Sequence, residues 1–115
     1  MAVKFANNSF STLSAGIDAT QLTFDVADGT KFPTLTGSDH MYLSIVGGSY
    51  TEIIKVTSVS TNTLTCVRGQ DGTTGTAALT GNRVELRVTT AMLTDLTGDG
   101  EHATKGLAIA MSVAL

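Results

Sequence analysis

The segment CVRGQDGTTGTAAL, from Cys66 to Leu79, has the residue types of a phosphate-binding loop. Arg68 precedes three glycines that recur at every third residue: Gly69, Gly72 and Gly75. Glycine-rich loops bind phosphate where backbone N–H groups and a positive charge converge at the start of a helix. The first question is therefore whether this segment binds an anion or only reverses the chain between two strands.

The spacing fits neither of the two common phosphate loops. A P-loop requires Lys and then Ser or Thr after its last glycine, whereas Thr76 and two alanines follow Gly75. A dinucleotide loop has one residue between its first two glycines, whereas two residues separate Gly69 from Gly72. The segment is also followed by a strand pattern rather than a helix, so we predict a structural turn.

In that turn Gly69 and Gly72 are expected to adopt positive φ, because glycine has no Cβ to clash there. Asp71 is expected to accept hydrogen bonds from backbone amides within the turn. Arg68 is expected to pair with a carboxylate or a backbone carbonyl.

A calcium loop is a second possibility, in the segment DLTGDG. Asp95, Thr97, Asp99 and Gly100 occupy the first, third, fifth and sixth positions of the pattern. The twelfth position requires a bidentate acid, and Gly106 stands there. A solvated turn is therefore favoured over a calcium site.

The remaining reactive side chains show no catalytic or zinc pattern. His40, His102 and Cys66 lack the spacing of ligand pairs. Each histidine directly follows a carboxylate, Asp39 or Glu101, which in so polar a chain indicates surface positions. Cys66 is expected to be buried within a strand. No nucleophile elbow and no marked pair of carboxylates is present. We predict no enzyme activity, no cofactor and no metal.

Composition is consistent with a single β-rich domain. The chain has 115 residues and a net charge of -3, which gives no basic face for nucleic acid. Charged residues make up 15% of it, against about 25% in typical domains. Ser and Thr replace them, which suits a pleated surface or faces covered by neighbours. The N-terminus lacks the apolar region of a signal peptide, so synthesis in the cytosol without export, and no membrane association, are expected.

Alternating apolar and polar residues predict most of the strands. The alternation occurs in QLTFDVAD, MYLSIV, YTEIIKVTSV, TLTCVRG and NRVELRVTT. Turns are expected at Asp28-Gly29, Gly47-Gly48 and Asn62. The one short helix is TTAMLTDL, with Thr89 or Thr90 as its N-cap. The expected fold is mainly β, a small antiparallel barrel or sandwich. Its expected core is Leu22, Phe24, Val26, Ile54, Val56, Leu64, Val84, Leu86 and Val88.

The two ends carry apolar residues where a soluble monomer would normally fray. We divide the chain into a β-rich domain, 1–96, and a C-terminal loop and apolar tail, 97–115. The tail run LAIAMSVAL alternates as a strand would, although a helix would also accept its alanines. At least one end is expected to pack on its own sheet or on a neighbouring chain. The candidate oligomer or partner contacts are Val3, Phe5, Leu107, Ile109, Met111, Val113 and Leu115.

Four segments, taken in order, resemble a family of virion structural proteins of tailed bacteriophages, the tail-fibre-like proteins. They are MAVKFANN, LTFDVADGTKFPTL, EIIKVTSVSTNTLTCVRGQDGTT and GNRVELRVTTAML, and the resemblance runs from Met1 to about Leu93. Its most specific parts are VRGQDGTT and RVELR. The chain departs mildly from the family pattern at Asp71, where Glu is more usual.

The resemblance implies a non-enzymatic virion component, made in the host cytoplasm, that acts as an assembly or attachment module of the tail fibre, tail tip or baseplate. It also implies a homo-oligomer, with a trimer favoured, and contacts with other virion proteins. A capsid decoration (cement) protein that stabilises the head lattice is the alternative within virions. A carbohydrate-binding module is the alternative from another class, and it would need an exposed aromatic platform.

Overall fold

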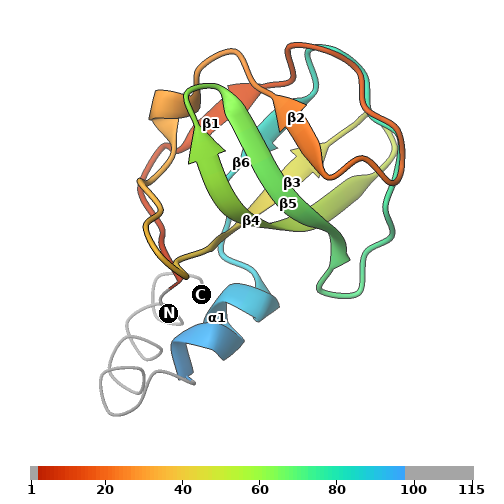
Figure 1. The fold of residues 1–115 in the computed structure, drawn as a ribbon. Coiled ribbons are helices and arrows are strands. Elements are labelled where there is room, and N and C mark those ends of the chain that lie inside the picture. The colour runs from red at the N-terminus through yellow and green to blue at the C-terminus, as the bar shows by residue number, and fades with distance from the viewer. Residues whose placement is uncertain (1–2, 98–115) are drawn as a thin grey trace.

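The computed structural model describes residues 3–97, which form a mainly β fold with one short α-helix (Figure 1). Six antiparallel strands make one curled, half-barrel sheet in the order β1-β6-β3-β4-β5-β2. The strands are β1 (Phe10–Thr12), β2 (Thr23–Asp25), β3 (Met41–Val46), β4 (Thr51–Ser60), β5 (Thr63–Gln70) and β6 (Arg83–Glu85). The predicted fold class is confirmed.

The centre of the sheet follows directly from the sequence pattern. β3 and β4 pair with Leu43 opposite Ile54, so that apolar side chains of both strands lie on the inner face. The glycines at 47–48 allow the chain to reverse between the two strands, and the Gly47 N–H donates to the Tyr50 carbonyl at 2.9 Å. β3 has the same limits as the alternating run MYLSIV, because the alternation and the pairing end at the same turn.

The two edge strands approach one another where the sheet curls. Leu13 and Val26 form an isolated antiparallel bridge, and the Ala27 N–H donates to the Thr12 carbonyl at 2.9 Å. This contact joins the continuation of β1 to the end of β2. The two strands therefore lie side by side over a short length only.

The inner face is filled by one large apolar core. Six of the nine expected core residues are buried in it: Phe24, Val26, Ile54, Val56, Leu64 and Val84. It also contains Leu13, Ile17, Phe32, Met41, Leu43, Ile45, Cys66 and Ala78. The burial of Cys66 is as expected.

Three core expectations need correction. Leu22 is 56% exposed and Val88 is 49% exposed, while Leu86 is half-buried. β2 begins after Leu22 and β6 ends at Glu85, so the alternation continues in the sequence after the chain has left the sheet. Period-two spacing buries a side chain only where a paired strand continues.

A 3-10 helix, η1 (Gly29–Lys31), replaces the simple turn expected at Asp28-Gly29. Asp28 caps it, because its Oδ1 accepts from the Thr30 N–H at 3.0 Å. Gly29 lies so close to the turn between β4 and β5 that a Cβ there would be 1.9 Å from the Thr61 carbonyl oxygen. Glycine at this position permits the close backbone contact.

The helix α1 (Thr90–Thr97) packs outside the sheet, against β3, and lies at the lower end of the molecule in Figure 1. Its first turn is capped by Thr89, whose Oγ1 accepts from the Met92 N–H at 3.2 Å. Met92, Val3 and Tyr42 form a second small core there. The expectation that the N-terminal arm can pack on its own sheet is confirmed for Val3.

The expected tail contacts, Leu107, Ile109, Met111, Val113 and Leu115, lie outside the described residues. Within residues 3–97, no helix combines the length and the apolar character needed to cross a bilayer.

Candidate functional site

The glycine-rich segment is organised around an ion pair between Arg68 and Glu52. The guanidinium Nε donates to Glu52 Oε2 at 2.8 Å, and Nη2 donates to Oε1 at 2.8 Å. Their side chains are 6% and 0% exposed, respectively. Glu52 reaches the inner face because it continues the inward alternation of Ile54 and Val56 on β4.

Backbone groups complete the hydrogen bonding of Arg68. Its Nη1 donates to the carbonyls of Asp18, at 2.7 Å, and Gln21, at 2.9 Å, while Nη2 also donates to the Thr76 carbonyl at 2.8 Å. Together with the bonds to Glu52, these contacts use all five N–H donors of a guanidinium. Arg68 therefore links β5 to the loop before β2 and to the glycine-rich segment.

Glu52 is equally well satisfied. Besides the two bonds from Arg68, Oε2 accepts from the Gly69 N–H at 2.9 Å and Oε1 accepts from the Thr76 N–H at 2.9 Å. Burial by itself would raise the pKa of Glu52, but the bonds from Arg68 and the two amides outweigh it, so the pKa is lowered. The bond to Glu52 raises the pKa of Arg68 in turn. Both groups stay charged.

This arrangement makes the RGQDGTT segment a structural clamp. The expectation that Arg68 pairs with a carboxylate and with backbone carbonyls is confirmed. Gly69 and Gly72 have φ of 61° and 79°, as expected. Two backbone amides of the segment, those of Gly69 and Thr76, donate to a carboxylate of the protein itself, Glu52.

Asp71 has a different role from the one expected. Its Oδ2 accepts from the Ala91 N–H at 3.2 Å, in the first turn of α1, instead of binding amides within its own turn. Its φ of 54° is a left-handed conformation that Asp tolerates better than most residues. A carboxylate beside the first turn of a helix is favourable because free N–H groups lie there. Asp71 therefore connects the turn to α1.

A second cluster joins α1 to β3 and consists of His40, Tyr42 and Asp95. His40 Nε2 and Asp95 Oδ2 lie 2.5 Å apart, and the Tyr42 hydroxyl donates to the same oxygen at 2.8 Å. The rings of His40 and Tyr42 meet edge to face, with centroids 5.4 Å apart. The surface position expected for His40 is wrong, because Val3 and α1 cover it; His102 lies outside the described residues.

The environment of Tyr42 favours its neutral hydroxyl. Burial, and then the hydrogen bond and negative charge of Asp95, raise the pKa of Tyr42 to about 12. The Nδ1 atom of His40 is buried and has no hydrogen-bond partner among the described residues. The cluster holds the helix against the sheet, and it uses the Asp95 carboxylate that opened the calcium-loop pattern.

Asp99, Gly100 and Gly106 of that pattern lie outside the described residues. In the described part of the chain, no three His, Cys, Asp or Glu side chains lie close enough together to hold a metal ion.

The surface carries several large apolar side chains. Phe5 is 58% exposed and Leu79 is 73% exposed. Phe10, on β1, is partly exposed, and the Arg83 guanidinium lies 4.4 Å above the centre of its ring. Exposed Phe with neighbouring Arg is a composition typical of protein–protein contact sites. Of the two N-terminal contact candidates, Phe5 is therefore available to a partner, whereas Val3 is covered by its own chain.

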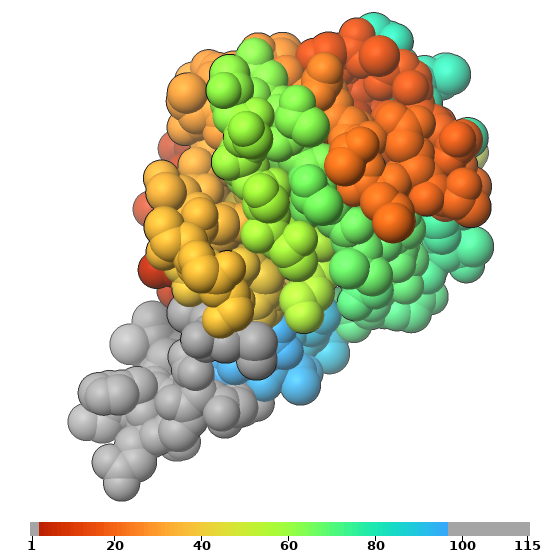
Figure 2. Space-filling view, in the orientation of Figure 1, coloured from red at the N-terminus to blue at the C-terminus, as the bar shows by residue number. Residues whose placement is uncertain are grey.

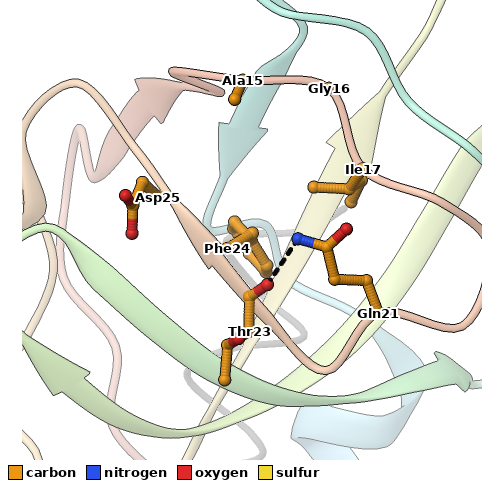
Figure 3. Close-up of a pocket in the computed structure, with 7 residues that line it drawn as sticks. All are labelled: Ala15, Gly16, Ile17, Gln21, Thr23, Phe24 and Asp25. Atoms are coloured by element: carbon orange, nitrogen blue, oxygen red, sulfur yellow. Dashed lines mark hydrogen bonds between the residues drawn. The ribbon is translucent and has the colours of Figure 1, made fainter.

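A small cavity of about 240 Å³ lies between residues 15–17 and β2 (Figure 3). Ile17 and Phe24 supply apolar side chains to it, and Gln21 and Asp25 supply polar ones. Figure 2 shows this part of the chain, in red to orange, at the upper right of the molecule beside the green of β5.

These features define a small antiparallel β protein whose characteristic motif is a structural clamp. No protein-family model matches the chain, and no curated protein is detectably similar to it in sequence.

Proposed function

We propose that this chain is a non-enzymatic structural component of a tailed-phage virion, an assembly module of the tail fibre, tail tip or baseplate. The proposal starts from the resemblance of four segments to tail-fibre-like proteins. The carrying observation is the clamp formed by Glu52 and Arg68, which binds the most specific of those segments into the fold. On this proposal, the segment that resembles the family most specifically stabilises the fold and does not bind a ligand.

The outer surface supports a binding role that relies on apolar area. Phe5, Phe10, Leu79 and Val88 are exposed in the single chain. Covering such side chains contributes about 25 cal/mol per Å² of apolar area removed from water. In a chain with so few charges, association would rest on this area and on strand edges.

The direct test is the composition and structure of the phage particle. Mass spectrometry of purified virions should detect the chain, and cryo-electron microscopy should show tail density that fits residues 3–97. Absence of the chain from purified particles would overturn the proposal. A copy number that matches the capsid lattice would replace the tail with the alternative of a decoration protein.

A further inference from the structure

The outward side of β5 and of its two neighbouring strands faces solvent. β5 lies between β4 and β2 in the sheet, and Figure 2 shows β4 and β5, in lime to green, across the front of the molecule. Leu64 and Cys66 of β5 are buried in the core, so Thr63, Thr65 and Val67 point outward. Val67 is 48% exposed. We call the outward side of these three strands the outer face.

Thr65 lies at the middle of the outer face. Its partners in the sheet are Thr23 on β2 and Ser58 on β4, and both of these residues are exposed. The middle of the face therefore offers hydroxyl and methyl groups. Another protein can cover such a surface without removing a charge from water.

Two opposite charges flank this uncharged middle. Asp25 on β2 is opposite Thr63, and Lys55 on β4 is opposite Val67, so both belong to the outer face. Asp25 is exposed and accepts a hydrogen bond from the Thr63 hydroxyl at 2.6 Å, and Lys55 is partly exposed. Among residues 3–97, neither Asp25 nor Lys55 forms a salt bridge.

The two charges are placed symmetrically about Thr65. β5 separates their strands, and Thr65 is midway between Thr63 and Val67, the residues opposite Asp25 and Lys55. From the regular spacings of a sheet, Asp25 and Lys55 are about 16 Å apart. A two-fold axis over Thr65, at right angles to the line from Asp25 to Lys55, would bring each Asp25 to Lys55 of the other copy.

We propose that two copies of the chain pair through the outer face, with two ion pairs between Asp25 and Lys55 around an uncharged centre. A two-fold contact requires a surface that is complementary to itself, and the placement of the two charges provides one. Protein interfaces keep charges out of their centre, and complementary charges fix the register of the partners. The proposal deepens the proposed assembly function, on which it rests, by naming the contact between copies.

Reversal of each charge tests the pairing. Sedimentation velocity over a range of protein concentrations should show a dimer of the parent chain and measures its dissociation constant. Lys55→Glu places two pairs of like charges in the contact and should weaken the dimer at least about tenfold. Asp25→Lys should weaken it to a similar extent for the same reason.

A mixture of the two single variants is the decisive measurement. When a Lys55→Glu chain meets an Asp25→Lys chain, both contacts again join opposite charges. The mixture should therefore dimerise about as tightly as the parent, although neither variant does so alone. Such restoration would also show that both variants are folded.

Lys31→Glu is the matched control for the change in net charge. Lys31 is exposed on η1, which packs against β1, outside the outer face. This variant changes the net charge by the same amount as Lys55→Glu, and it should leave the dissociation constant unchanged. An equal weakening by both variants would show that net charge, and not this contact, governs association.

The remaining outcomes also overturn the proposal. They are a parent chain that is monomeric or trimeric at every concentration, a dimer that neither Lys55→Glu nor Asp25→Lys weakens, and a mixture that associates no better than its components. If the chain is nevertheless found in virions, only this contact is wrong. If the charge variants behave as expected but the chain is absent from virions, only the proposed function is wrong.

Discussion

Arg68 and Glu52 face each other inside the half-barrel through two parallel hydrogen bonds, each 2.8 Å long. Neither side chain has more than 6% of its surface exposed. Desolvation of such a pair is costly, and its Coulombic attraction offsets that cost only when the remaining donors and acceptors are also satisfied. Here the backbone satisfies them, so loss of one partner leaves a buried charge without compensation.

The first prediction follows from this pair. Glu52→Gln should lower the free energy of unfolding by about 3–5 kcal/mol, because Arg68 would remain buried opposite a neutral amide. Urea denaturation followed by circular dichroism measures the change. Glu85→Gln is the matched control, since the partners of Glu85 are Arg83 and Arg87, whose side chains are about half exposed to solvent. It should cost about 0–1 kcal/mol. Equal costs for the two variants would show that the clamp contributes little.

The second prediction concerns acid. The pKa of Glu52 is lowered from 4.5 in the folded chain, so the unfolded chain binds more protons below that pH. The contribution of Glu52 to stability is therefore complete above pH 4.5 and is lost as pH falls through the folded pKa. Urea titrations at a series of acid pH values should show a steeper loss for the parent than for Glu52→Gln. If the free energy of unfolding fell equally with pH in both proteins, Glu52 would not contribute to the acid dependence of stability.

The lowered pKa values of Asp18, Asp28 and Asp39 are common to both proteins in that comparison. Each arises first from a hydrogen bond to a nearby Thr. The difference between the two curves therefore isolates Glu52.

The sequence predicts a feature of this structure well when the residues that form it are close together in the chain, and poorly when they are far apart. The limits of β3 and the positive φ of Gly69 and Gly72 follow from local rules, namely alternation and the freedom of glycine. The partner of Arg68 is 16 residues away, across a pair of strands with irregular register. A sequence can show that Arg68 needs an acceptor without showing which strand will supply it.

The cluster on α1 shows the same limit more strongly. His40 and Asp95 are 55 residues apart, and they meet only because α1 packs against β3. Asp39 is next to His40 in the chain, yet it binds Thr36. The neighbouring carboxylate led us to expect a surface position for His40, whereas the carboxylate that His40 meets comes from a distant element. The signal available beforehand was a single histidine just before an apolar strand, which is compatible with burial.

A third prediction compares two apolar residues of one segment. Phe24→Ala should cost about 3–5 kcal/mol, because the ring is 3% exposed in the main core. Leu22→Ala should change the free energy of unfolding by less than about 1 kcal/mol, because most of that side chain is already exposed. Thermal and urea unfolding of the two variants checks this. If Leu22→Ala were as destabilising as Phe24→Ala, Leu22 would be a buried core residue in solution, as the alternating sequence pattern predicted.

A fourth prediction concerns Gly75, the last of the three glycines in the segment from Cys66 to Leu79. A Cβ at Gly75 would lie 2.4 Å from the Ala19 carbonyl oxygen, so Gly75→Ala forces two backbone segments apart. We expect a loss of about 1–3 kcal/mol, as for other overpacked sites. Gly48→Ala is the matched control, because no atom lies within 4 Å of its added Cβ. It should be nearly neutral, and a similar loss at both sites would exclude the steric explanation.

The fifth prediction concerns Tyr42, whose pKa burial and Asp95 raise from 10.0 to about 12. The unfolded chain loses the phenolic proton first, so the contribution of Tyr42 to stability is complete below pH 10 and is lost as pH rises toward 12. Tyrosinate absorbance should show a late transition that Tyr42→Phe removes. Asp95→Asn should move that transition to lower pH, because a neutral amide no longer disfavours the phenolate, while burial keeps it above the ordinary value. A late transition unchanged by Asp95→Asn would mean that the Tyr42 hydroxyl does not meet Asp95 in solution, and would leave only the contact between His40 and Asp95 as a polar link of that carboxylate to the sheet.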